Sequence, residues 1–154
     1  MTHREVAEAN FKEGYNCSQA VFAAFSEEVG LPRQTALQLA SGFGGGIGRM
    51  REVCGAFSGA VMALGALYGS DDPAHKTAVY AMVQELAAKF KAETGSLICR
   101  ELLGLDKPEG SPVASPRTET YYKKRPCVEM VGLAADLLEQ YLAEHPVPRR
   151  EANA

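Results

Sequence analysis

The chain has 154 residues, of which 46% are hydrophobic and 23% charged, and its formal net charge is −3. This length and composition are typical of one globular domain with a sizeable core. The 16 basic and 19 acidic residues leave no excess of positive charge for binding nucleic acid. Ala and Leu are common while Val, Ile and Thr are sparse, which favours helices over strands. We therefore expect an all-α protein without a nucleic-acid partner.

The N-terminal segment carries charges throughout and shows no apolar core of a signal peptide. We therefore expect a cytoplasmic protein, whose cysteines are not presumed to form structural disulfides. One uncharged stretch, residues 53–69, is at the lower edge of the length of a membrane span. Because it is rich in Gly, Ala and Ser, we interpret it as a buried central helix and expect no membrane association.

The first part of the chain is predicted to contain three helices. Gly14 and Gly30 are suitable stops for the first two, Asn16 is a good N-cap for the second, and Pro32 suits the start of the third. Their expected bounds are 2–13, 17–29 and 32–41.

Four more helices are predicted after a glycine-rich loop. A proline-containing surface loop over residues 105–120 separates the last of them from the others. We expect one helical bundle of about six or seven helices over residues 1–145 and a flexible polar tail over 146–154. The four helices are expected over 54–68, 72–95, 96–104 and 126–142.

The glycine-rich loop, GFGGGIGRMREVC, raises the question of phosphate binding. Neither the dinucleotide fingerprint nor the Walker pattern fits it, and the preceding segment is helical. Its backbone amides can still cradle an anion at a helix start. In the alternative that we prefer, the loop is a tight turn that lets two helices approach closely. The candidate cofactor-binding residues are Gly44, Gly45, Gly46 and Arg49.

The four cysteines lie far apart in the sequence, separated by 36, 44 and 27 residues. None belongs to a C-x-x-C pair of the kind found in zinc ribbons or ferredoxins. Each falls near the start of a predicted helix, where exposed amides and the helix dipole favour a thiolate. This placement indicates nucleophilic or metal-binding sulfurs, although buried and chemically inert cysteines are the simpler interpretation. The four are Cys17, Cys54, Cys99 and Cys127.

The segments around these cysteines resemble the redox-active C_GCAxxG_C_C family. The segments are GYNCSQAV, GGGIGRMREVCGAFSG, ICRELLG and RPCVEM, and the resemblance covers about residues 11–142. One departure is that Val53, and not Gly, precedes Cys54. The resemblance implies that all four sulfurs act together. A similar region in split-Soret-type cytochromes is associated with an iron–sulfur cluster, but this chain lacks the C-x-x-C-H sequence for covalent haem.

Three interpretations remain open at this stage. In the first, the four cysteines are catalytic in thiol–disulfide or electron-transfer chemistry, as in an oxidoreductase with a redox partner of unknown identity. Cys54 is then the expected reactive thiol, activated by Arg49 and Arg51. In the second, all four cysteines bind a metal, either a [2Fe–2S] cluster or zinc. In the third, the cysteines are inert and the chain forms a homodimer through a face containing Gly55 and Gly59.

Overall fold

The computed structural model describes residues 1–105, 110–124 and 126–148. Over these residues the chain forms nine α-helices, six of them with at least seven residues, one 3-10 helix and a single isolated β-bridge. The expected all-α fold is confirmed, with more helices than predicted. The elements are α1 (His3–Lys12), α2 (Cys17–Ala24), α3 (Ser26–Val29), α4 (Arg33–Ala40), α5 (Gly55–Tyr68), η1 (Pro73–His75), α6 (Lys76–Thr94), α7 (Cys99–Leu102), α8 (Glu119–Lys124) and α9 (Cys127–Glu144).

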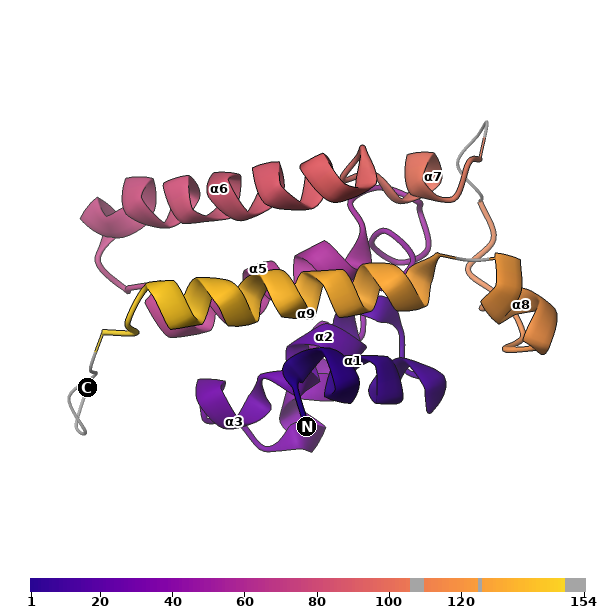
Figure 1. The fold of residues 1–154 in the computed structure, drawn as a ribbon, viewed down its shortest axis with the longest axis horizontal. Coiled ribbons are helices and arrows are strands. Elements are labelled where there is room, and N and C mark those ends of the chain that lie inside the picture. Colours follow the sequence, from indigo (N-terminus) through magenta and orange to yellow (C-terminus); the bar gives the residue numbers. More distant parts are fainter. Residues whose placement is uncertain (106–109, 125, 149–154) are drawn as a thin grey trace.

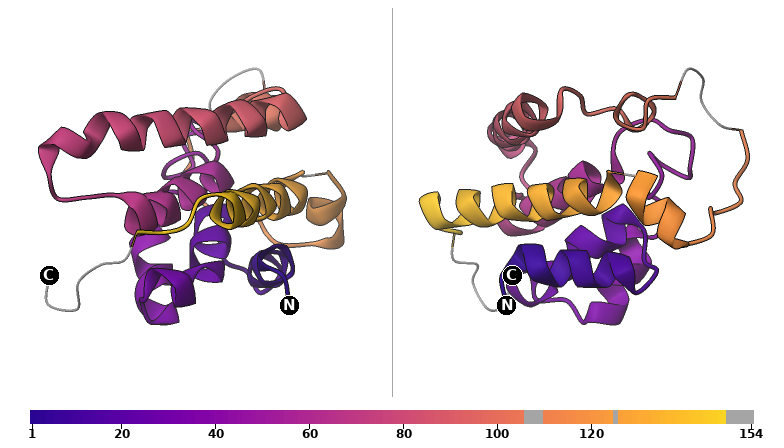
Figure 2. Two further views of the ribbon diagram at one scale, coloured as in Figure 1. Left: turned by 60° about the vertical axis from the view of Figure 1, so that its left-hand side comes forward. Right: turned by 45° about the vertical axis from the view of Figure 1, so that its right-hand side comes forward.

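The long helices form three layers (Figures 1 and 2). Helix α6 lies on one side, α5 and α9 form the middle, and α1 to α4 lie on the other side. Helix α9 contacts α1, α2, α5 and α6, and α2 also packs against α5. The middle layer is therefore covered on both sides, and the core that it forms contains Phe11, Phe25, Leu64, Phe90 and Leu138, all fully buried.

Helix α5 is the buried central helix that the sequence predicts. A side chain at Gly59 would place its Cβ 2.6 Å from the carbonyl oxygen of Ser18 in α2, so the two backbones are in close contact. Gly55 is also buried within the chain. The face of Gly55 and Gly59, which the third interpretation assigns to a homodimer, is covered within the chain by α2 and the glycine-rich loop. No helix of the described chain is long and apolar enough to cross a membrane.

Two of the differences from the predicted helices have local causes. The second predicted helix divides at Phe25, whose φ of −106° and ψ of 12° interrupt the helical geometry between α2 and α3. Helix α8 was not predicted. Thr118 caps its start, because the Thr118 hydroxyl accepts a hydrogen bond from the N–H of Tyr121 at 3.1 Å. The last six residues of the expected tail, 149–154, lie outside the described residues.

Candidate functional site: four thiols around one cavity

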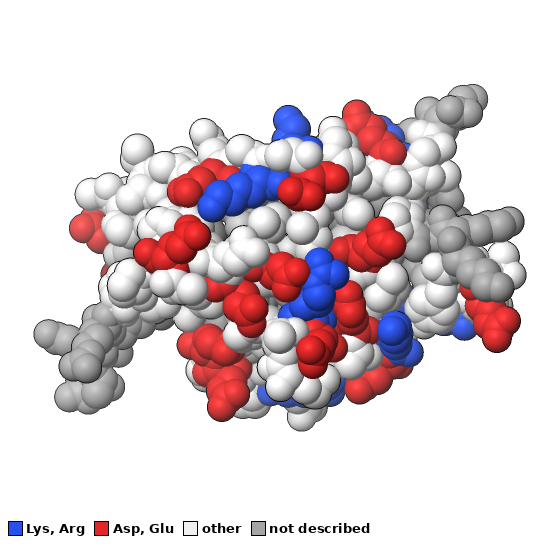
Figure 3. All heavy atoms as spheres, viewed as in Figure 1, with Lys and Arg blue, Asp and Glu red and all other residues white. Residues whose placement is uncertain are grey.

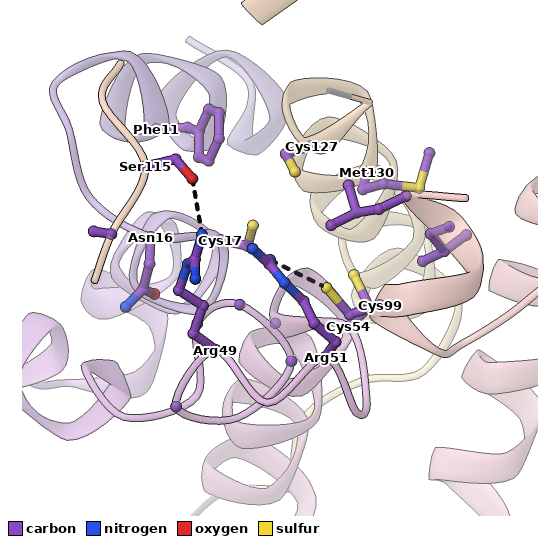
Figure 4. Close-up of a pocket in the computed structure, with 18 of the residues that line it drawn as sticks. Phe11, Asn16, Cys17, Arg49, Arg51, Cys54, Cys99, Ser115, Cys127 and Met130 are labelled. Carbon is purple, nitrogen blue, oxygen red and sulfur yellow. Dashed lines mark hydrogen bonds between the residues drawn. The ribbon is translucent and has the colours of Figure 1, made fainter. Parts of the chain in front are cut away.

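Each of the four cysteines stands at the start of a different helix. Cys17, Cys99 and Cys127 are the first residues of α2, α7 and α9, and Cys54 is the N-cap of α5. The predicted position at helix starts is thus confirmed for all four. All four side chains also line one cavity of about 410 Å³, shown in Figure 4. The fold therefore gathers thiols that are distant in sequence.

The β-bridge between Val53 and Ile98 brings Cys54 and Cys99 together. The N–H of Cys54 donates to the carbonyl oxygen of Leu97 at 2.7 Å, and the N–H of Cys99 donates to that of Glu52 at 2.6 Å. In an antiparallel pairing of this register, residues 54 and 99 are diagonal neighbours on the same side. We call Cys54 and Cys99 the inner pair, because their exposed fractions are only 6% and 9%.

Cys17 and Cys127 form a second pair, and the side chain of Cys127 is the largest influence on the protonation of Cys17. They enter the cavity from the starts of α2 and α9, two helices that pack together. Both residues are half-buried and more accessible than the inner pair. We call Cys17 and Cys127 the outer pair. The site thus contains one half-buried pair of cysteines and one pair that is almost completely buried.

Hydrogen bonding and burial set the protonation of these thiols. The hydrogen bond to Cys127 raises the pKa of Cys17 well above its ordinary value, and burial raises it further. Burial raises the pKa of Cys54 to about 11, although the backbone amides of Phe57 and Ala56 act in the opposite direction. The prediction that Cys54 is an activated thiol is therefore wrong, because desolvation outweighs the helix start.

The two arginines expected to activate Cys54 have other partners. Arg51 is 5% exposed, and its Nη1 donates a hydrogen bond to Sγ of Cys99 at 3.7 Å. Arg49 donates from Nη1 to the carbonyl oxygen of Ser111 at 2.8 Å and from Nη2 to Oγ of Ser115 at 3.0 Å. A guanidinium beside Cys99 stabilises negative charge on that sulfur. Both guanidinium groups lie beside the cavity in Figure 4.

Residues 111–117, which we call the strap, form one wall of the cavity. Arg117 anchors the strap through hydrogen bonds from Nη1 to the carbonyl oxygen of Phe11 at 2.9 Å and from Nη2 to that of Tyr15 at 3.0 Å. Its guanidinium also lies 4.1 Å from the centre of the Phe11 ring, in a cation–π contact. The proline-containing loop predicted on the surface is therefore, over these residues, part of the site.

The glycine-rich loop contains a left-handed turn. Five consecutive residues, from Gly45 to Arg49, have φ between +56° and +73°. This left-handed backbone conformation is unfavourable by about 1–2 kcal/mol for a residue other than glycine. At Gly46 a Cβ would lie 2.6 Å from the backbone nitrogen of Glu52 and 2.7 Å from Cβ of Cys99. The loop is therefore a tight turn, but one that packs against a thiol. The candidate cofactor-binding residues, Gly44, Gly45, Gly46 and Arg49, all line the cavity.

The described residues do not fit a metal centre in this arrangement. Within the described ranges, no three or more His, Cys, Asp or Glu side chains are placed so that they could hold a metal ion. A structural zinc site needs four ligands at about 2.0–2.3 Å, and an iron–sulfur cluster is also held by several thiolates at once. We therefore derive no chemistry of this site from a bound metal.

These features define an all-helical protein in which four thiols from four helix starts share one cavity. Residues 15–141 match the family described as "Putative redox-active protein (C_GCAxxG_C_C)", and the chain belongs to this family. The resemblance seen in the sequence is thus confirmed over most of the chain. No curated protein and no solved structure matches the chain.

Proposed function

We propose that the protein is a thiol–disulfide oxidoreductase in which the outer pair, Cys17 and Cys127, forms and breaks a disulfide. The observation that carries this proposal is that both side chains line the same cavity, where Cys127 is the main influence on the protonation of Cys17. Disulfide exchange proceeds by direct attack of one sulfur on another, so the two sulfurs must come into near contact. The family description supports redox activity in general terms.

The raised pKa of Cys17 suggests the order of the two steps. Cys17 keeps its proton at neutral pH. The Cys127 thiolate attacks one sulfur of a substrate disulfide, forming a mixed disulfide and expelling the other half of the substrate, which takes up a proton. Cys17 then loses its proton and attacks Sγ of Cys127, which releases the second substrate thiol. Two electrons pass to the substrate, and the protein is left with a Cys17–Cys127 disulfide.

The inner pair has a different role in this proposal. Cys54 and Cys99 line the same cavity as Cys17, and in this proposal a second exchange passes the outer disulfide to them. A redox partner must finally reduce the protein. A cytoplasmic location suits this cycle, since the thiol pools there keep cysteines reduced.

Equilibration with redox buffers tests the proposal. The reduced protein is incubated anaerobically with mixtures of reduced and oxidised dithiothreitol, quenched with acid, alkylated and analysed by peptide mapping. We expect Cys17–Cys127 to be the first disulfide formed. The variants Cys17→Ser and Cys127→Ser should lose it, while the matched control Cys54→Ser should keep it.

Two outcomes would count against this function. One is that no intramolecular disulfide forms at any ratio of the buffer or with an excess of hydroxyethyl disulfide, a stronger oxidant. The other is visible charge-transfer absorption in protein purified anaerobically, which would show that the cysteines hold an iron–sulfur cluster instead.

A further inference from the structure

We propose that the cavity selects a low-molecular-weight disulfide that carries carboxylate groups, and that its arginines provide the selection. This inference rests on the proposed function, because it names the substrate class of the same thiols. In the reaction, the two thiols of the outer pair become a disulfide while one molecule of the substrate becomes two anionic thiols. Electrons and protons therefore balance without a further reactant.

The charge of the cavity wall is the first argument. Arg49, Arg51 and Arg117 all line the cavity, and no Asp or Glu does so in the part of the chain that the structure describes. Arg51 is almost completely buried, so its charge acts through a medium less polarisable than water. Guanidinium groups also match the planar geometry of carboxylates and can bind them through two parallel hydrogen bonds.

The rest of the molecule has the opposite electrostatic character. The formal net charge of the chain is −3. On the face formed by α6, α9 and α1, acidic side chains are spread among basic ones (Figure 3). Arg4 and Lys89 on these helices are already paired with acidic side chains. A small anion is therefore attracted to the cavity more than to this outer surface.

The size and the apolar wall of the cavity are the second argument. A volume of about 410 Å³ falls in the range of small-molecule sites, which is about 300–1,000 Å³. Phe11, Leu102, Tyr121 and Met130 contribute apolar surface next to the sulfurs. Such a cavity can enclose the carbon chains of a small organic disulfide while the arginines bind its charged ends.

Three small disulfides of similar size and different charge test the selection. They are dithiodiglycolate, which is anionic, hydroxyethyl disulfide, which is neutral, and cystamine, which is cationic. The rate at which each oxidises the reduced protein is measured and divided by its rate with free dithiothreitol, a neutral dithiol, which removes differences in intrinsic reactivity. We expect the normalised rates to decrease in that order, with dithiodiglycolate at least tenfold faster than cystamine.

Variants that remove one positive charge assign the effect to the cavity. Arg49→Gln and Arg51→Gln should each reduce the preference for dithiodiglycolate severalfold. Lys89→Gln removes the same charge from an exposed ion pair on α6 and should leave the preference unchanged. If Arg51→Gln fails to fold, as judged from its thermal melting, Arg49→Gln and the order of rates in the unmodified protein still decide the question.

The possible results separate this inference from the proposed function. Equal normalised rates, or a preference for cystamine, would overturn the charge selection while leaving the disulfide chemistry intact. The inference alone also fails if dithiothreitol buffers oxidise the outer pair but none of the three disulfides reacts. If the buffers do not oxidise the outer pair either, the proposed function fails together with the inference.

Discussion

The carboxylate of Glu139 in α9 lies 2.6 Å from Nδ1 of His3 and accepts a hydrogen bond from its backbone N–H at 3.2 Å. Oε1 of Glu28 lies 2.6 Å from Nε2, the other ring nitrogen of His3. The imidazole also stacks on Phe25, with ring centres 4.2 Å apart. One histidine at the start of α1 thus connects three helices that are distant in sequence.

This contact predicts a pH dependence of stability. Burial opposes the charged form of His3, but the hydrogen bonds to Glu139 and Glu28 outweigh it and raise the pKa of His3. The stabilisation is therefore complete below the ordinary pKa of about 6.5 and is lost as the pH rises through the raised value. The hydrogen bond from His3 lowers the pKa of Glu139, so the contribution of this carboxylate is lost only in acid.

We expect the free energy of unfolding, measured by thermal denaturation, to fall by about 1 kcal/mol or less between pH 6 and 8.5, since the contact of His3 with the two carboxylates is partly exposed. The variant His3→Gln should show a smaller slope over this range, and the control His75→Gln should retain the original slope. Parallel pH profiles of the His3 variant and the unmodified protein would contradict the assignment.

The left-handed turn provides a matched pair of glycine substitutions. Gly46 and Gly48 both have positive φ, but a Cβ at Gly48 would meet no atom within 4 Å, while one at Gly46 would overlap Glu52 and Cys99. Gly48→Ala should therefore lower the free energy of unfolding by about 1–2 kcal/mol, because of its backbone conformation alone. Gly46→Ala should lower it by about 1–3 kcal/mol more, because of overpacking. Urea denaturation measures both, and equal losses would show that Gly46 is not tightly packed.

Helix α5 offers a second pair, with changes of opposite sign. A Cβ at Gly59 would lie 2.6 Å from the Ser18 carbonyl oxygen, whereas one at Gly65 would meet nothing within 4 Å. Gly65→Ala should stabilise the protein by about 0.5–1 kcal/mol, because alanine loses less backbone entropy in a helix. Gly59→Ala should destabilise it by about 1–3 kcal/mol. Stabilisation by both changes would mean that α2 and α5 are less closely packed than we describe.

The raised pKa of Cys54 predicts slow alkylation in the folded protein. Its value of about 11 lies two units above the reference value of 9.0, so the thiolate fraction at pH 7 is roughly a hundredfold smaller than after unfolding. Iodoacetamide labelling followed by peptide mapping should show this difference between native protein and protein in urea. The native rate should increase with pH up to about 11. Fast labelling of native Cys54 at pH 7 would contradict the burial that we assign.

The sequence predicts the helices and the helix starts of the cysteines because these depend on local signals. Asn16 caps α2 through its side chain, and Pro126 precedes α9, as the residue types suggest. The contacts that assemble the site are not local. The bridge of Val53 with Ile98 involves too few residues to give a periodic pattern, and the strap is fixed by Arg117, which contacts residues more than 100 positions away.

The error about Cys54 has a related cause. A helix start and nearby arginines are visible in the sequence, and both favour a thiolate. The degree of burial depends on the tertiary packing of α5 and α7, and at this position burial has the larger effect. The direction of the shift could therefore be predicted only once the fold was known.

The positions of Cys17 and Cys127 far apart in the sequence have a consequence for the lifetime of the protein. A covalent bond between them would enclose a loop of roughly 110 residues, and a loop of about 100 residues removes chain entropy worth about 4.7 kcal/mol from the unfolded state. Oxidation would then join the start of α2 to the start of α9. The oxidised molecule would resist heat and proteolysis better than the reduced one. The amount of protein that survives would then depend on the redox conditions to which it had been exposed.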